Sequence, residues 1–223
     1  MKVVLIRHGE SQANKIDSEQ YKLLCGRYDC DLTERGIEQA LSLKDNELIK
    51  NADAVYCSPL KRTVHTAKLL TDKELYIDER IQERTMGDFD GKTLADLDKN
   101  PKYSNYFTDA KYMNFRNSFT VSAPNGENYS DVVERVTDFL NEIYAKNHKQ
   151  VVIVSHAVAI RCLIKVINNL SEEEKWVKYV AQPGDTLWDV FNKSKCDLNE
   201  FLNKNGLKGI YILPGLVYFV KES

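Results

Sequence analysis

The sequence lacks a large net charge of either sign. Its 31 lysines and arginines stand against 33 aspartates and glutamates, so the formal net charge is only −2. Binding to nucleic acid or to an anionic membrane usually depends on a clear positive excess. We therefore expect neither partner, and any anion that the protein binds must be held by a local group of arginine and histidine side chains.

The sequence also lacks a long apolar run and a cysteine motif. The run Val3–Ile6 is much too short for a signal-peptide core or a membrane span, and no later segment approaches one. The five cysteines are an odd number without CxxC spacing, which argues against a disulfide framework and against a zinc site. We predict free thiols in a reducing, cytoplasmic compartment.

Short apolar runs alternate with helical patterns over the first 170 residues. The runs Lys2–Ile6, Ala54–Cys57 and Val151–Ser155 predict strands, and the last is so apolar that both of its faces should be covered. Helices are predicted after a cap at Thr33, over Lys61–Leu70, from Ser130 onward and over Ala157–Ile167. This alternation is typical of an α/β domain with a mainly parallel sheet, whose active site lies at the carboxyl ends of the strands.

The pattern changes after residue 167. The stretch 168–175 (NNLSEEEK) loses the apolar spacing and is interpreted as a hinge. Beyond it the sequence predicts a strand at Tyr179–Ala181, a turn at Pro183-Gly184, a helix capped by Asp185, a helix at Leu198–Asn203 and a strand at Leu216–Val220. We therefore expect two domains, residues 1–170 and a small βααβ unit at residues 178–221.

Four side chains that bind or attack phosphate follow the predicted strands. Arg7 and His8 leave the first strand, His156 leaves the third, and Arg62 lies just past the second, on the first turn of a helix. Arginine forks match phosphate oxygens, and a neutral imidazole, with a pKa of about 6.5, is a competent nucleophile. The second imidazole can donate to a phosphoryl oxygen in the transition state. Because the arginines supply the positive charge, we expect no metal and no cofactor.

The motifs around these residues resemble those of the histidine phosphatase superfamily, which contains the phosphoglycerate mutases and fructose-2,6-bisphosphatase. The resemblance covers nearly all of residues 1–167 in the family's order. It rests on LIRHGES (5–11), GRYDCDLTERGIEQA (26–40), SPLKRTVHTA (58–67), ERTMGDFDG (83–91), GENYSDVVERV (126–136) and VVIVSHAVAIRCLI (151–164). It implies a three-layer α/β/α sandwich around a mostly parallel sheet.

Carried over by position, the resemblance implies a role for each site residue. His8 would be the phosphorylated nucleophile, and Glu83 would be the general acid for the leaving oxygen and then the base that activates water. The phosphate-pocket residues that it implies are Arg7, Asn14, Arg62 and His156. Arg84 and Glu127 either touch the substrate or hold loops in place, and the sequence leaves this open. We thus expect a phosphoric monoester hydrolase that works through a phosphohistidine.

The sequence favours hydrolysis over phosphoryl transfer within one substrate. Only 34 residues separate Gly91 from Gly126, fewer than expected of the cofactor-dependent mutases. The nearest likeness is to fructose-2,6-bisphosphatase, where Arg161 would fall on a sugar-phosphate-binding arginine. However, the TVSAPN stretch before Gly126 carries no cation and Ala157 replaces a glutamine. We predict a small phosphomonoester substrate, such as a sugar or glycerate phosphate. A phosphomutase and a glycan-binding protein with a vestigial pocket are the alternatives.

Residues 178–221 resemble a LysM domain. The resemblance rests on Gly184-Asp185-Thr186-Leu187-Trp188, then Leu202, Asn205 and Pro214-Gly215, at the family's spacing. It implies binding of an N-acetylglucosamine-containing glycan in a groove lined by Gly184, Asp185, Thr186 and Leu187 on one side and Ile212, Leu213 and Pro214 on the other. Such a module would make attachment to the cell wall an alternative location. A stabilising or dimerising appendage is the alternative role, and the sequence predicts no oligomeric state.

Overall fold

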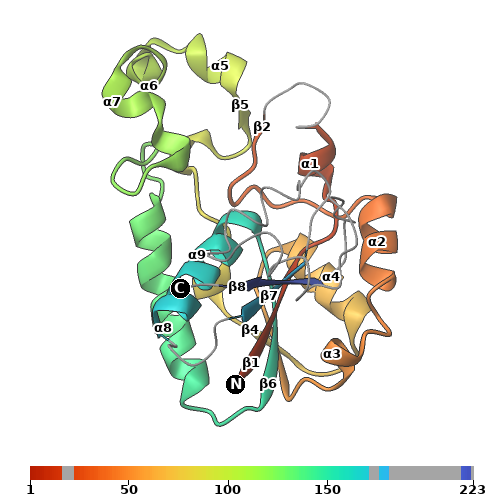
Figure 1. Ribbon diagram of the computed structural model, residues 1–223. Coiled ribbons are helices and arrows are strands. Elements are labelled where there is room, and N and C mark those ends of the chain that lie inside the picture. The colour runs from red at the N-terminus through yellow and green to blue at the C-terminus, as the bar shows by residue number, and fades with distance from the viewer. Residues whose placement is uncertain (17–22, 171–175, 181–216, 222–223) are drawn as a thin grey trace, which may run out of the picture.

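The computed structural model describes residues 1–16, 23–170, 176–180 and 217–221. A six-stranded sheet has the strand order β4-β3-β6-β1-β7-β8 (Figure 1). The strands are β1 (Lys2–Arg7), β3 (Ala54–Cys57), β4 (Leu75–Ile77), β6 (Gln150–Ser155), β7 (Trp176–Val180) and β8 (Val217–Lys221). All neighbours are parallel except β8, which runs antiparallel to β7. The predicted α/β fold with a mostly parallel sheet is confirmed.

The three strands predicted from the sequence lie side by side within this sheet. β1 and β6 pair in parallel over their full length, up to Arg7↔Ser155, and β3 pairs with the other side of β6. Every residue of β3 and β6 is buried, as expected for strands that are covered on both faces. Because the ends of β1 and β6 are level, the next residues, His8 and His156, leave the same edge of the sheet together.

Helices cover both faces of the sheet (Figure 1). One face carries α8 (Tyr129–Tyr144) and α9 (Ala157–Leu170), and the other carries α2 (Glu34–Leu41), α3 (Glu47–Lys50) and α4 (Lys61–Leu70). Leu5 of β1 enters the apolar cluster on the α8 side, while its neighbours Val4 and Ile6 enter the cluster on the α4 side. This alternation follows from the two-residue period of a strand.

Side-chain caps fix the starts of two predicted helices. Thr33 accepts a hydrogen bond from a backbone N–H in the first turn of α2, as predicted. At the start of α8, the Asn128 side chain accepts from the N–H groups of Ser130 and Asp131, and the Asp131 carboxylate accepts from the Asn128 N–H. This reciprocal capping box moves the helix start one residue ahead of the predicted Ser130.

A third apolar cluster lies beyond the carboxyl edge of the sheet (Figure 1). Its buried members are Leu24, Phe89, Leu97, Tyr103, Phe115 and Ala123. Most of them belong to residues 92–123, which we call the cover segment. The elements around it are β2 (Leu23–Leu24), antiparallel to β5 (Lys92–Thr93), the helices α5 (Leu94–Asp98), α6 (Asn105–Thr108) and α7 (Ala110–Met113), and the 3-10 turns η3 (Gly87–Phe89), η4 (Pro101–Tyr103) and η5 (Phe115–Asn117).

The two C-terminal strands join the main sheet. β7 pairs with β1, at Val4↔Lys178, and β8 pairs along the full length of β7. The sequence predicts strands at 179–181 and 216–220 as the two ends of a separate unit, whereas the structure makes β7 and β8 the edge of one continuous sheet. The predicted helices and groove residues of that unit, all within 181–216, lie outside the described residues. Among the residues that are described, no helix combines the length and apolar composition needed to cross a membrane.

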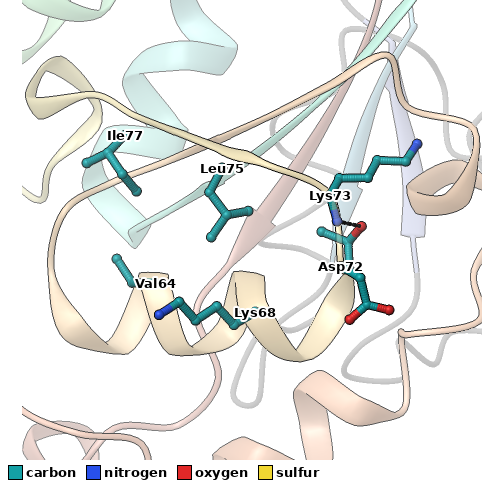
Figure 2. A pocket seen from close by; sticks show the side chains of 7 residues that line it. Val64, Lys68, Asp72, Lys73, Leu75 and Ile77 are labelled. Atoms are coloured by element: carbon teal, nitrogen blue, oxygen red, sulfur yellow. Dashed lines mark hydrogen bonds between the residues drawn. The ribbon is translucent and has the colours of Figure 1, made fainter.

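A shallow groove of about 550 Å³ runs between α4 and the edge strand β4 (Figure 2). Its lining residues are Val64, Lys68, Thr71, Asp72, Lys73, Leu75 and Ile77. None of the residues that the sequence predicts for the site is among them. The ammonium group of Lys73 donates to the carbonyl oxygens of Lys50 and Ala52, so it ties the turn after α3 to the turn after α4.

Candidate active site

His8 lies at the carboxyl edge of the sheet, directly after β1. Its backbone N–H donates to Ser155 O of β6 (3.1 Å), and the residue is only 6% exposed. The ring Nδ1 lies 2.7 Å from Gly9 O, and Arg62 Nε lies 3.3 Å from the ring Nε2. Because a carbonyl oxygen can only accept, Nδ1 must carry the hydrogen. The lone pair is therefore on Nε2, on the side of Arg62.

Burial and positive charge keep both histidines neutral. Burial lowers the pKa of His8 well below its ordinary value of 6.5, and the charges of Arg7 and Arg62 lower it further, although the hydrogen bond to Gly9 acts in the opposite direction. Burial also lowers the pKa of His156 well below 6.5, with smaller effects from His8 and the arginines. Near neutral pH each ring therefore keeps one unprotonated nitrogen.

His156 lies behind His8, at the end of β6. The two ring centroids are 5.1 Å apart and the ring planes are inclined by 58°. Nε2 of His156 lies 2.8 Å from Ser58 Oγ, while its buried Nδ1 has no hydrogen-bond partner among the described residues. Ser58 Oγ accepts from the Leu60 N–H (3.4 Å) and can donate its own hydrogen to Nε2, which leaves the ring proton of His156 on Nδ1.

Arg62 enters the site from the first turn of α4. The residue is 2% exposed, and its two terminal nitrogens donate to Tyr28 O (2.8 Å) and Gly26 O (2.9 Å). The carbonyls of the 26–28 loop thus fix the plane of the guanidinium group. Its Nε–H is the part that faces His8.

The loop after His8 is held by close backbone packing. Thr66, one turn after Arg62 on α4, accepts from the Gly9 N–H (3.1 Å). A Cβ atom at Gly9 would lie 2.2 Å from Gly36 O, at a separation that no side chain tolerates. Glycine at both positions therefore allows α2 and α4 to press the loop against the sheet.

A cavity of about 120 Å³ lies between this loop, α4 and the loop that carries Glu83. Its lining residues are Arg7, His8, Ser11, Asn14, Cys25, Gly26, Arg62, Glu83, Arg84, Met86 and Val158. Most of the residues predicted for the phosphate site are thus brought together at one cavity. His156 is fully buried and contributes from behind His8 rather than to the lining.

Five of the lining residues are not among those predicted from the sequence. Ser11 is tied to the predicted Asn14, whose Oδ1 accepts from both the backbone N–H (3.1 Å) and the hydroxyl (2.9 Å) of Ser11. The RHGES motif contains this serine, so its presence there was a usable signal. Cys25, Gly26, Met86 and Val158 carry no chemical signature, and only the folded chain places them at the cavity.

Glu83 lines the same cavity as His8, from the loop after η2 (Glu79–Ile81). Its carboxylate accepts two backbone hydrogen bonds, from Arg84 N to Oε1 (2.7 Å) and from Val158 N to Oε2 (3.2 Å). The second donor is in the first turn of α9, where backbone N–H groups have no partner within the helix. The two contacts hold the carboxylate at the cavity wall.

Arg84 lines the cavity, but its guanidinium group is bound to the cover segment. NH2 donates to Arg116 O (2.7 Å) and NH1 approaches Phe115 O (3.5 Å), with the group 4.9 Å above the Tyr129 ring. Burial lowers the pKa of Arg84. Its main visible role is thus to hold residues 115–116 of the cover segment next to the site.

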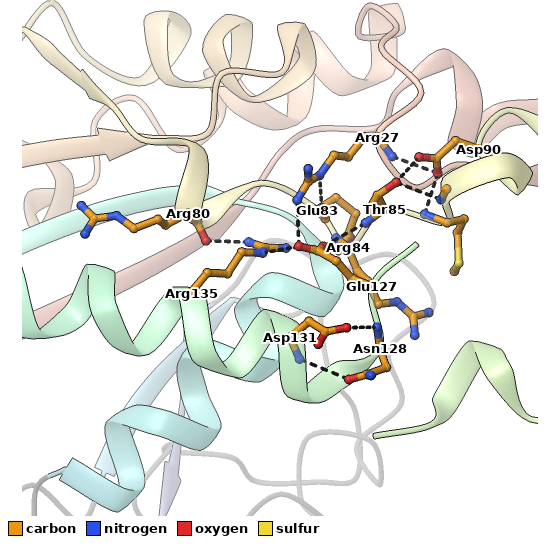
Figure 3. Close-up of polar contacts among 12 residues, drawn as sticks. Arg27, Arg80, Glu83, Arg84, Thr85, Asp90, Glu127, Asn128, Asp131 and Arg135 are labelled. Atoms are coloured by element: carbon orange, nitrogen blue, oxygen red, sulfur yellow. Dashed lines mark hydrogen bonds and ion pairs between the residues drawn. The ribbon is translucent and has the colours of Figure 1, made fainter. Parts of the chain in front are cut away.

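Glu127 and Arg161 do not line the cavity. The carboxylate of Glu127 is bound by Arg27, Arg135 and the backbone of the Glu83 loop (Figure 3). Arg161 is exposed on α9. Of the two roles that the sequence leaves open for Glu127, the structure shows contacts that hold loops in place. The observed cavity brings neither residue to the phosphate site.

The chain is similar to several known proteins in sequence and in structure. A model of the Histidine phosphatase superfamily (branch 1) matches residues 3–199. Phosphoserine phosphatase 1 of Hydrogenobacter thermophilus is 30% identical over 79% of this chain and 80% of its own. A 2,3-bisphosphoglycerate-dependent phosphoglycerate mutase of Bifidobacterium longum is 30% identical over 78% and 79%. Among solved structures, the alpha-ribazole phosphatase from Shigella flexneri is 30% identical, with a TM-score of 0.60, and the match covers 78% of this chain and 81% of that one.

Proposed function

This chain belongs to the histidine phosphatase superfamily (branch 1), and from that membership we propose that His8 carries the phosphoryl group from the substrate to water. The protein is a phosphomonoester hydrolase that acts on small phosphorylated substrates. What we add is the assignment of its chemistry to particular side chains.

One observation carries the assignment of the nucleophile. The hydrogen bond from His8 Nδ1 to Gly9 O (2.7 Å) leaves the lone pair on Nε2, at a cavity that is also lined by Arg7 and Arg62. The lowered pKa of His8 keeps that lone pair available. A neutral imidazole fixed in one tautomer beside two guanidinium groups is suited to attack a bound phosphoryl group.

The first step forms a bond between His8 Nε2 and phosphorus and breaks the bond from phosphorus to the leaving oxygen. In this proposal Arg7, Arg62 and Asn14 bind the phosphoryl oxygens, and His156 stabilises the charge from behind. The Arg62 Nε–H that donates to the lone pair in the free enzyme turns to an oxygen of the substrate. These groups supply the charge compensation that phosphoryl transfer needs.

Glu83 carries the proton in both steps of the proposal. In its protonated form it donates to the leaving oxygen, so the alcohol departs neutral. The resulting carboxylate then takes a proton from water as the water oxygen attacks phosphorus and the bond from phosphorus to His8 Nε2 breaks. Its place among the residues that line the cavity together with His8 supports this role.

Trapping of the intermediate tests the proposal. Rapid mixing with a 32P-labelled phosphomonoester, followed by a quench in alkali, is expected to leave label on the protein in an acid-labile bond. Peptide mapping should place the label on His8, and His8→Ala should abolish it. Turnover that persists at the wild-type rate in His8→Ala would rule out the assignment.

The cavity supports a small substrate. A volume of about 120 Å³ suits a phosphoryl group, with the rest of a small substrate, such as the predicted sugar or glycerate phosphate, extending out of the cavity. We propose that Arg84, beside the cavity, contributes positive charge toward an acidic or polar leaving group. Arg161 would reach a substrate only if the leaving group extended along α9. A screen of phosphorylated metabolites against the purified protein identifies the substrate.

A phosphomutase is the alternative, because one relative that is 30% identical is a phosphoglycerate mutase. A mutase returns the phosphoryl group to a second hydroxyl faster than water removes it. A single-turnover experiment with a 32P-labelled bisphosphorylated metabolite distinguishes the two reactions. We expect released inorganic phosphate to exceed the isomerised product.

The LysM-like unit and its glycan partner stay predictions from the sequence pattern. Residues 181–216 lie outside the described residues. β7 and β8 pair within the main sheet, and the family match extends to residue 199. Both facts support a C-terminal segment that completes the phosphatase domain. Sedimentation with chitin or peptidoglycan tests the glycan hypothesis directly.

We also propose a reducing, cytoplasmic location. Among the cysteines that the structure describes, Cys30, Cys57 and Cys162 are free thiols. Burial raises the pKa of Cys57 and Cys162 to about 12, so these two act as small apolar side chains and not as reactive thiolates.

A further inference from the structure

The carboxylate of Glu127 anchors the loop that carries Glu83. Glu127 and Thr85 form a reciprocal pair, in which the Glu127 N–H donates to Thr85 O (3.0 Å) and the Thr85 N–H donates to Glu127 Oε2 (3.1 Å). The partner in this pair is two residues from Glu83. A movement of the Glu127 carboxylate would therefore move the backbone next to the proposed general acid.

Arg27 and Arg135 link the Glu127 carboxylate to further backbone atoms of the loop that carries Glu83 (Figure 3). Arg27 donates through NH2 to Glu127 Oε1 (3.0 Å) and through Nε to the backbone carbonyl of Glu83 (3.0 Å). Arg135 of α8 binds the same carboxylate with Nε and NH2 (2.9 and 3.0 Å) and donates through NH1 to Arg80 O. The stretch from residue 80 to residue 85 is thus held at three backbone atoms by one ionic cluster.

The bonding capacity of this carboxylate is full. Oε1 accepts from Arg27 and Arg135, and Oε2 accepts from Arg135 and Thr85. Four donors occupy the four lone-pair sites that a carboxylate offers. The Glu127 side chain is 18% exposed, so the charge is balanced by the guanidinium groups and not by bulk water. The carboxylate therefore has no lone pair left to accept a hydrogen bond from a substrate. Its contacts hold the loop that carries Glu83.

The same cluster reaches the phosphate side of the cavity. The carbonyls of Gly26 and Tyr28, on either side of Arg27, accept from the guanidinium group of Arg62. The Arg27 backbone N–H donates to Asp90 Oδ1 (3.2 Å), at the far end of the Glu83 loop. The loop around Arg27 therefore connects the group that faces His8 with the loop that presents Glu83.

We infer that Glu127, acting through Arg27 and Arg135, is a positioning residue that sets the place of the Glu83 carboxylate relative to His8. This inference rests on the proposed role of Glu83 as the general acid. A displacement of about 1 Å at such a group costs up to about 100-fold in rate. The effect falls on proton transfer to the leaving oxygen, so it depends on how much protonation that oxygen needs.

Glu127→Gln tests the inference with two substrates, an alkyl phosphate that the wild type hydrolyses and p-nitrophenyl phosphate. The amide offers one acceptor oxygen and turns an NH2 group toward donors, so the clamp loosens. We expect kcat/KM, which reports transfer of the phosphoryl group to His8, to fall about 10- to 100-fold for the alkyl phosphate and less than about threefold for p-nitrophenyl phosphate. Equal slowing of the two substrates overturns the inference.

Glu142→Gln is the matched control. Glu142 is also a glutamate that binds an arginine, Arg80, at 2.6 Å, but its carboxylate does not contact the Glu83 loop backbone. The charge change is the same, and both rates should stay within about twofold of the wild type. Arg27→Lys is the second variant if Glu127→Gln does not fold. It keeps the charge but loses the fork that binds Glu83 O and Glu127 together, and the alkyl substrate should again be slowed selectively.

A double-mutant cycle separates positioning from a general structural role. In the Glu83→Gln background no proton donor remains to be placed, so Glu127→Gln should cause no further loss with the alkyl phosphate. Full additivity of the two losses contradicts the inference. Labelling of His8 in the same variants reports on the proposed function separately: wild-type enzyme that forms no phosphohistidine refutes the nucleophile assignment, whereas normal labelling with additive losses refutes only the role of Glu127.

Discussion

Two sides of the cavity are built in different ways. The phosphate floor, formed by Arg7, His8, Arg62 and His156, is positioned by strand ends and by the first turn of a helix. The acid wall, residues 83–90 with Glu127, consists of loop backbone held by carboxylates and arginines. The floor takes its geometry from the sheet, while the wall takes its geometry from an ionic cluster that is partly exposed to solvent.

Because the two sides are built differently, mutations in them should impair catalysis in different ways. A change in the floor should disturb the binding and attack of every phosphoryl group, whatever the leaving group. A change in the wall should matter most when the leaving oxygen needs a proton. Substrates with good and poor leaving groups therefore report on the two sides separately.

The largest effect is expected from removal of the floor's nucleophile. His8→Ala should lower kcat for both alkyl and aryl phosphates by about 10⁴-fold or more, because no other group can form the covalent intermediate. Steady-state assays with both substrates measure this. His65→Gln, a histidine change on α4 away from the cavity lining, is the control and should stay within about twofold. A leaving-group-dependent loss in His8→Ala would break the distinction between floor and wall.

Glu83→Gln tests the wall directly. Without a proton to give, kcat/KM for an alkyl phosphate should fall about 10²- to 10³-fold, whereas kcat/KM for p-nitrophenyl phosphate should lose less than about tenfold. The ratio of the two losses is the measured quantity. A ratio near one would remove Glu83 from the role of general acid.

Ser58→Ala tests the part of the phosphate floor around His156. The variant removes the hydroxyl 2.8 Å from His156 Nε2, so the ring no longer has a partner that fixes its proton on Nδ1. We expect kcat to fall about 10-fold, equally for both leaving groups, in line with the loss of one aligned donor. Nitrogen-15 NMR of the histidine rings should show a mixture of tautomers. Ser42→Ala, on the exposed end of α2, is the control.

The smallest effect concerns stability against pH. The folded pKa values of His8 and His156 are lowered, so the unfolded chain binds more protons than the folded chain below pH 6.5. Stability is therefore fully present above pH 6.5 and falls as the pH decreases, by up to about 1.4 kcal/mol per pH unit for each histidine. His156→Asn should roughly halve that slope in urea unfolding between pH 6.5 and 5.5. Parallel curves for the two proteins would contradict this explanation.

The floor could be predicted from the sequence because its residues are adjacent to strong local signals. Arg7, His8 and His156 directly follow apolar runs that only a buried strand explains, and Arg62 lies on the first turn of the helix after the second such run. Parallel pairing brings the carboxyl ends of neighbouring strands to one edge of the sheet, so these residues meet there. β4 escaped detection because its three residues stand in the charged stretch DKELYIDER, where no periodicity is visible.

The wall could not be predicted in the same way. Glu127 is bound by an arginine 100 positions earlier in the chain, and neither residue carries a pattern that identifies the other. Arg84 similarly binds carbonyl groups of the cover segment, some 30 residues away. Backbone acceptors cannot be recognised in a sequence, so motif position gave a role for Glu83 but left the roles of Arg84 and Glu127 open.

The separate core of the cover segment has a consequence for how this enzyme can diversify. Its buried cluster around Phe89 and Phe115 shares no member with the two clusters that flank the sheet. Residues 92–123 are joined to the catalytic side through Phe89, which packs in the cluster, through the backbone carbonyls that Arg84 binds, and through the Asp88 carboxylate that accepts from Tyr103. Mutations can therefore accumulate in this segment without unfolding the sheet. None of the described residues that line the cavity lies between positions 92 and 123, so such mutations leave the groups around His8 in place.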